Sequence, residues 1–187
     1  IPHDRDLFDS RYGFITLFAE GLDKEKTSLV PGDSLSFSFS TKSLIKISNY
    51  YLQSFNDVPP SASLNASDEE RIADIKTNSV SGYTLGPWLP DSSLSLVDFT
   101  DTLETFRFRS CEELDWATDA GVCGELQDYL SEVKTALEME DSLSAANALA
   151  EFIALVEAEK DASLTSEGYA LLYFNAEYLA DRLTKPK

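Results

Sequence analysis

Apolar residues recur at helical spacing throughout the last third of the chain. The clearest stripe, with i, i+3, i+4, i+7 spacing on one helical face, is Leu149, Phe152, Ile153 and Val156. Similar stripes lie before and after it: Leu126, Leu130, Val133 and Leu137, then Leu172, Ala176, Leu179 and Leu183. A capping-box pair, Ser110 and Glu113, precedes them and predicts a first short helix. Helices with one apolar side each bury those sides together, so residues 110–187 are predicted to form a small four-helix bundle.

The first part of the chain has the patterns of strands and turns. Leu35, Phe37 and Phe39 alternate with serines, which is typical of a strand with one face in a core. Residues 12–19 are apolar at successive positions, as in a strand buried on both sides. More strands are predicted at 44–51 and, as a pair around Thr100-Asp101, at 94–109. Residues 78–93 are rich in turn-forming residues and are predicted as a loop, and Ser67 with Glu70 predicts a short helix.

The spacing of apolar residues changes from two to 3.6 near Ser110, where we expect a domain boundary. The predicted fold class is therefore α+β. An N-terminal antiparallel β-sandwich-like module, residues 1–109, precedes the small helical bundle of residues 110–187.

The helical part also resembles a known family. The features that carry the resemblance are the helix with Leu126 and Leu130, the block AANALAEFIALVEA (145–158) and the final YLADRL (178–183). Over about residues 111–183 they are similar to the FIMAH-type helical domain, although Cys123 departs from the pattern of that family. The family is a short all-α module near the C-termini of secreted multidomain bacterial and archaeal proteins. The resemblance implies a secreted, accessory role, and it supplies no catalytic residues.

Two cysteines, Cys111 and Cys123, lie at the predicted boundary. They do not form a CxxC redox pair, and two cysteines without nearby histidine cannot complete a structural zinc site. A turn at Gly121-Val122 could bring their Cα atoms within the roughly 7 Å that a bond requires. We predict a disulfide, the alternative being two buried thiols. A disulfide favours an extracellular or periplasmic location.

The chain is strongly acidic. It has 15 Lys and Arg residues against 33 Asp and Glu residues, a formal net charge of −18. Phosphate binding needs a basic patch, so nucleic acid and anionic membranes are poor partners. We interpret the acidity as a solubility feature rather than as a cation-binding one. No apolar run approaches the roughly 20 residues of a membrane span.

Two N-terminal features suggest possible modifications or ligands. Asp4, Asp6 and Asp9 could hold calcium, but their spacing matches no EF-hand loop, so we expect a solvated arm and no cofactor. Asn65 begins the sequon Asn65-Ala66-Ser67, which we expect to be unoccupied.

Catalytic patterns are scarce. His3 is the single histidine, which argues against histidine-based triads and metal sites. The sequence contains no nucleophile elbow, Walker loop or dinucleotide fingerprint. An acidic-pair hydrolase remains a weak alternative, because no carboxylate spacing selects a pair. We therefore predict a protein that is not an enzyme.

Tyr83 and Trp88 carry the other alternative. Aromatic side chains on a loop can stack on sugar rings, as in carbohydrate-binding modules. Trp88 could instead close the β-core or pack on the bundle. Asn175 is expected to make a capping or interhelix hydrogen bond. The favoured interpretation is a non-catalytic extracellular structural, accessory or assembly component. It would act through protein–protein contacts made chiefly by the β-module.

Overall fold

The computed structural model describes residues 8–9, 14–15, 42–52, 70, 73 and 76–184. The chain divides into two compact units, Ile1–Ser40 and Thr41–Lys187. In the first unit, strands β1 (Phe8–Asp9) and β2 (Phe14–Ile15) pair in antiparallel fashion.

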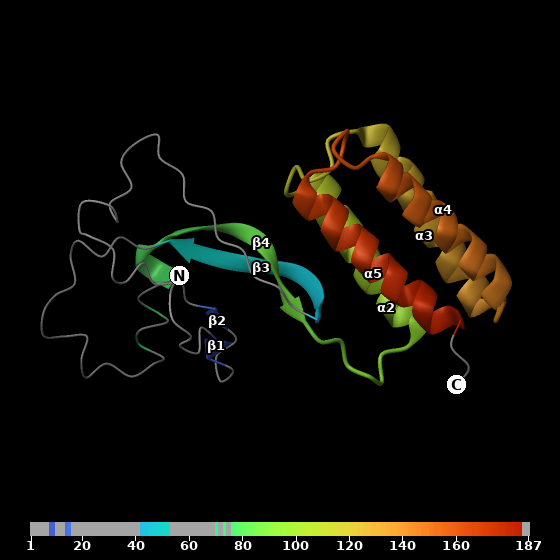
Figure 1. Cartoon of the computed structure of the whole chain (residues 1–187), viewed down its shortest axis with the longest axis horizontal. Coiled ribbons are helices and arrows are strands. Elements are labelled where there is room, and N and C mark those ends of the chain that lie inside the picture. Colours follow the sequence, from blue (N-terminus) through green and yellow to red (C-terminus); the bar gives the residue numbers. More distant parts are fainter. Residues whose placement is uncertain are drawn as a thin grey trace, which may run out of the picture. The chain divides into compact units, whose positions relative to one another are not determined.

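The second unit is α+β, with one antiparallel pair of strands followed by a helical bundle (Figure 1). Strand β3 (Leu44–Leu52) pairs with β4 (Val80–Trp88) without interruption from one end to the other. The helices are α2 (Leu96–Glu112), α3 (Ala120–Glu138), α4 (Ser142–Ala158) and α5 (Ser166–Thr184). Short connections make successive helices antiparallel neighbours, and α5 returns beside α2 to close the bundle.

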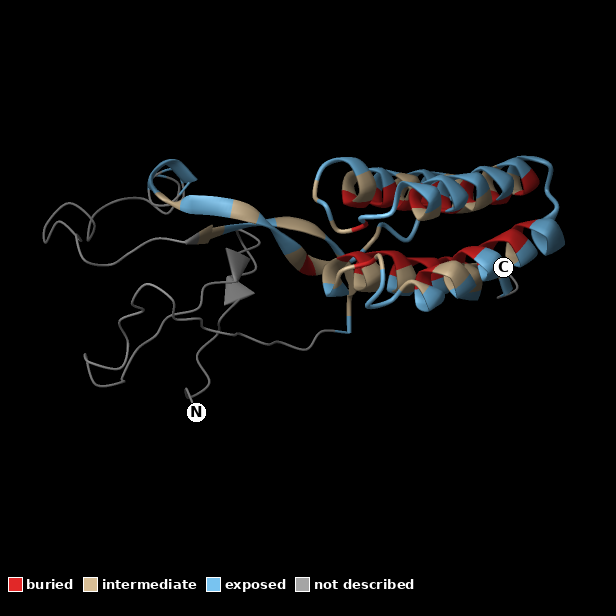
Figure 2. Cartoon of the chain, turned by 90° about the horizontal axis from the view of Figure 1, so that it is seen from above, coloured by how far each residue is buried: buried red, intermediate tan, exposed pale blue. Residues whose placement is uncertain are grey.

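The predicted helical stripes form the bundle core, which Figure 2 shows as buried faces turned inward on the helices. The fully or almost fully buried members are Leu126, Leu130, Val133, Leu149, Phe152, Val156, Leu172, Ala176 and Leu179. The outermost members, Leu137, Ile153 and Leu183, are half-buried because they lie at the margins of their stripes. Each fully buried Leu or Phe contributes about 1.5–3 kcal/mol, so this shared core dominates the stability of the bundle.

Side-chain oxygens cap all four of these helices at their N-termini. Ser95 accepts from the N–H of Asp98, and Asp119 accepts from two N–H groups of the first turn of α3. Asp141 and Thr165 play the same role for α4 and α5. Each cap satisfies backbone donors that the helix itself leaves unpaired, which fixes where the helix begins.

The prediction of two strands over residues 94–109 is wrong, because residues 96–109 belong to helix α2 and Ser95 caps it. The alternation of Phe106 and Phe108 with arginines resembles a strand locally. At helical spacing, however, Phe99, Leu103 and Phe106 share one buried face. A continuous helix therefore crosses Ser110, and the predicted change from strand to helix does not occur there. Ser110 lies in the last turns of α2 and does not begin a helix.

The prediction of a loop over residues 78–93 is also wrong in part, because Val80–Trp88 is strand β4. Glycines in this segment suggested turns, but cross-strand side chains cover them. A Cβ atom at Gly82 would meet the ring of Tyr50, and one at Gly86 would meet the side chain of Ser48. These glycines therefore lie in a paired strand, beneath side chains of β3, and not in a turn.

The predicted β-sandwich is not formed by the described residues, whose named strands make two two-stranded sheets. Strand β3 confirms the strand expected at 44–51. Positions 70, 73 and 76–78 are helical, as expected for the short helix. The strand expected at 34–40 lies outside the described residues.

The predicted disulfide is confirmed. Cys111 and Cys123 are bonded, with Cα atoms 6.1 Å apart. The chain reverses between the end of α2 and the cap of α3, where Asp115 has a positive φ of 53°. The expected turn at Gly121-Val122 is wrong, because both residues are helical. The bond joins the C-terminal end of α2 to the first turns of α3, and it indicates an oxidising compartment.

We expect reduction, or Cys111→Ser with Cys123→Ser, to lower the free energy of unfolding by about 3 kcal/mol, because the bond restricts the unfolded chain. Urea unfolding with and without reductant measures the loss. Intact mass after alkylation is the control. Two thiols that react without prior reduction would contradict the disulfide.

Candidate interaction site

The candidate site is the β3–β4 ribbon, residues 44–52 and 80–88, where it joins the bundle and extends from it. Trp88 makes the join. Its ring stacks on Phe99 of α2 with centroids 5.8 Å apart and 11° between planes, and it meets Phe106 edge-on at 5.9 Å. Leu44, opposite Trp88 on β3, packs on the same core. Aromatic contacts of this geometry contribute beyond the area they bury, so one end of the ribbon is held firmly.

Asn175 of α5 makes the second attachment. Its side chain is fully buried. The Nδ2 atom donates to the carbonyl oxygen of Ile45 at 2.9 Å and to that of Leu171 in its own helix at 2.8 Å. The Oδ1 atom is buried without a hydrogen-bond partner. The expected interhelix or capping role is thus replaced by a bond from a helix to a strand.

This bond also reveals which backbone groups of β3 face away from β4. The carbonyl of Ile45 points outward to Asn175, and Pro87, its partner on β4, has no N–H to donate. In an antiparallel pair, residues alternate between facing the partner strand and facing outward. The outward set on β3 therefore continues with Ile47, Asn49 and Tyr51.

The distal half of the ribbon, residues 48–52 and 80–84, carries exposed aromatic and apolar side chains. Tyr83 is 51% exposed, and Tyr50 and Val80 are exposed as well. The guanidinium of Arg109 lies over the Tyr83 ring, 4.8 Å from its centroid, so α2 borders β4 at this point. Within the described chain, the sheet that contains β3 and β4 has no third strand. The outer edge of β3 is thus left without a strand partner among these residues.

The aromatic platform suggested by Tyr83 and Trp88 is not formed. The two residues lie five positions apart on an unbroken strand, so their side chains face opposite sides of the sheet. Phe99 also occupies one face of the Trp88 ring. The alternative, in which Trp88 packs on the bundle, describes its position.

The other sequence-predicted residues are not brought to this site. Cys111 and Cys123 are bonded to each other in the bundle. Asp4, Asp6 and Asn65 lie outside the described residues, and Asp9 is placed only as part of the backbone of β1. The part of the chain that the structure describes contains no cluster of three or more His, Cys, Asp or Glu that could hold a metal ion. None of its helices is long and apolar enough to cross a membrane.

The sequence alone did not identify Ile45 and Pro87 as residues whose backbone groups face the outer edges of the ribbon. A signal was present, since a proline within a strand is confined to an edge position with its nitrogen facing outward. The turn-like composition around Pro87 concealed the strand itself. Asn175 was singled out, but its partner lies 130 positions away in the sequence.

Comparison with known proteins adds no relative: no family model, curated protein or solved structure matches this chain.

Replacing Trp88 by alanine should lower the free energy of unfolding by about 3 kcal/mol, because Phe99 and Phe106 lose their cover. Tyr83→Ala is the matched control on the opposite face and should cost less than about 1 kcal/mol, since it loses one exposed cation–π contact. Urea unfolding followed by circular dichroism compares the two. Equal effects would contradict the assignment of Trp88 as the attachment.

Asn175→Ala should lower the free energy of unfolding by about 1–3 kcal/mol, because the carbonyl of Ile45 loses its donor. The amides at residues 44–47 should also exchange faster with solvent. Asn147→Ala, on the exposed surface of α4, is the control and should change neither quantity. Unchanged exchange at the ribbon in Asn175→Ala would show that this bond does not hold it.

Proposed function

We propose that this protein is a non-catalytic assembly module that binds a partner protein by adding a strand to the outer edge of β3. The observation that carries the proposal is the ribbon, which is attached to the bundle at one end and has no third strand beside β3 among the described residues. Strand addition uses such groups for affinity and the alternating side chains beside them for specificity.

The energetics favour a third strand. A two-stranded ribbon is marginally stable by itself in water, and an exposed edge is a template for pairing. Trp88 and Asn175 stabilise one end, while the distal half has exposed side chains that a partner could cover. A partner strand on β3 would satisfy the N–H and C=O groups of Ile47, Asn49 and Tyr51.

Strand β3 is favoured over β4 because Pro87 interrupts the row of N–H donors along the outer edge of β4, whereas residues 47–51 of β3 include no proline.

The resemblance of residues 111–183 to the FIMAH-type domain and the oxidising compartment indicated by the disulfide support a secreted accessory protein. The net charge of −18 opposes loose self-association. It therefore supports a defined contact with a different chain. The disulfide supports a location outside the cell or in a periplasm.

Hydrogen exchange tests the proposal directly. In the isolated chain, the inward amides of Lys46, Ser48 and Tyr50 should be protected and the outward amides of Ile47, Asn49 and Tyr51 should exchange fast. In the native assembly purified from the source, the outward amides should become protected by at least about tenfold, because the partner strand accepts from them. Exchange quenched at intervals and assigned by NMR reads each position. Outward amides that stay fast in the assembly would contradict the proposal.

A pair of proline variants supplies a second test. Asn49→Pro removes one outward N–H of β3 and spares the bonds to β4, so it should prevent incorporation into the assembly. Ser81→Pro makes the same change on the outer edge of β4 and should leave incorporation intact. Equal behaviour of the two folded variants would argue against the β3 edge.

A further inference from the structure

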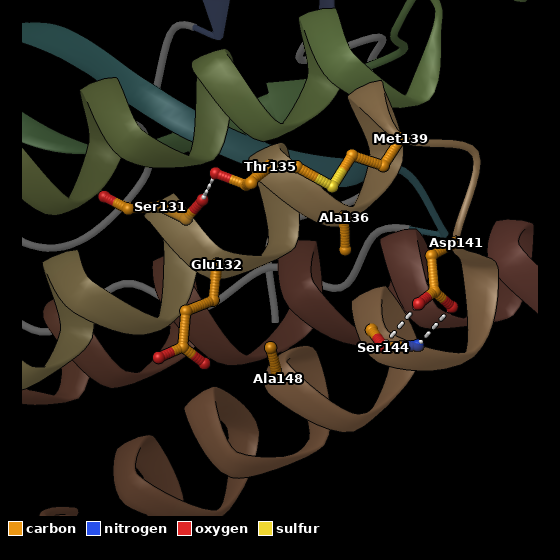
Figure 3. Close-up of a pocket in the computed structure, with 8 residues that line it drawn as sticks. All are labelled: Ser131, Glu132, Thr135, Ala136, Met139, Asp141, Ser144 and Ala148. Carbon is orange, nitrogen blue, oxygen red and sulfur yellow. Dashed lines mark hydrogen bonds between the residues drawn. The ribbon is translucent and has the colours of Figure 1, made fainter.

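A second surface lies on the bundle, in a groove between α3 and α4. The groove has a volume of about 440 Å³. Figure 3 shows its lining, which α3 and the turn after it supply on one side and α4 with its cap supplies on the other. The small, buried side chains of Ala136 and Ala148 leave room between the two helices.

The hydroxyl groups in the groove have already donated their protons. Ser131 donates to the carbonyl of Gln127 at 2.9 Å, and Thr135 donates to that of Ser131 at 2.8 Å. Ser144 donates to the carboxylate of Asp141 at 2.7 Å. Each hydroxyl has a single proton, so the oxygens can offer only lone pairs to a ligand.

The charged side chains in the groove are acceptors too. They are the carboxylates of Glu132 and Asp141. The backbone N–H and the hydroxyl of Ser144 both donate to Asp141 and hold the pKa of this carboxyl below its ordinary value. Lys134 is the single basic residue between Ala120 and Ala158, and its ammonium group is paired with Asp101 of α2 at 2.6 Å.

Apolar side chains flank these acceptors. Met139 lines the groove and Leu143 follows it at the start of α4, and each is 73% exposed. A free hydrated cation would leave both side chains uncovered. A polypeptide with apolar residues beside its basic ones would cover them while its cations approach the carboxylates.

We propose that the α3–α4 groove docks a basic amphipathic segment of a partner protein. Lysine or arginine side chains of that segment lie along Ala136 and Ala148, and their charged ends donate to Glu132, Asp141 and the three hydroxyl oxygens. The apolar side chains of the segment cover Met139 and Leu143. This surface is separate from the β3 edge, so either contact can fail while the other stands.

The test uses the full chain and a fluorescent synthetic amphipathic helix built from leucine and lysine. Anisotropy measures affinity, and NMR shift changes locate the contact. Glu132→Gln with Asp141→Asn should weaken binding by roughly tenfold or more, because hydrogen bonds to charged acceptors are lost. Asparagine caps a helix about as well as aspartate, so α4 keeps its start, and thermal unfolding checks this. Met139→Lys, at an exposed position, should weaken binding by a comparable factor through repulsion.

The control removes the same number of charges elsewhere. Glu112→Gln with Glu125→Gln should change affinity by less than about twofold at equal salt, because neither carboxylate lines the groove. Shift changes confined to residues 131–148 would support the proposal. An equal loss of affinity in the control variant would instead indicate general attraction to an acidic surface and overturn it. So would shift changes on the ribbon, or undiminished affinity in the groove variants.

Discussion

The stacking of Trp88 on Phe99 is the contact on which the arrangement of the second unit depends. Phe99 is fully buried on α2, and Trp88 ends strand β4, so one aromatic pair joins the ribbon to the bundle. Tyr178 of α5 packs on the same phenyl ring, with centroids 5.1 Å apart. Strand β4 and helices α2 and α5 therefore share one aromatic cluster. A ribbon of two strands gains from this cluster the stability that it lacks alone.

Hydrogen bonds at the same junction orient helix α5 relative to strand β3 and to the segment that precedes α2. Asn175 bonds α5 to the carbonyl of Ile45, and Arg182 of α5 donates to the carbonyl of Leu94 at 2.6 Å. Both bonds end on backbone oxygens, whose positions follow the register of the chain rather than the choice of side chain. Apolar contact alone would tolerate sliding of the ribbon. The directional bond from Asn175 to Ile45 restricts such sliding, because it holds one carbonyl of β3 at a fixed position on α5.

The two proposed contacts depend on different interactions, backbone hydrogen bonds at the β3 edge and charge complementarity at the groove. The edge of β3 offers backbone groups, which any extended segment can match, so specificity there depends on side chains such as Tyr51. The α3–α4 groove offers acceptors and carboxylates, which select a cationic segment. A protein with a net charge of −18 repels its own copies, and both contacts therefore favour a partner of different composition.

The helical part of this fold could be predicted from sequence because its information is local. The stripes around Leu126, Phe152 and Leu179 recur every turn, and they are buried in the bundle as expected. The proximity of Cys111 and Cys123 could be inferred too, since only a short segment separates them.

Whether the segments within residues 80–112 form strand or helix was decided only by the tertiary structure. Phe106 and Phe108 fit a strand or a helix equally well over four residues, and burial against Trp88 and the bundle favours the helix. Gly82 by itself favours a turn, but in the structure it lies in β4, paired with Tyr50 of β3. The bond from Asn175 to Ile45 joins a helix to a strand. The groove likewise combines residues of two helices, such as Ser131 of α3 and Ser144 of α4. Local spacing carries no information on such pairs, because they are set by how the elements pack.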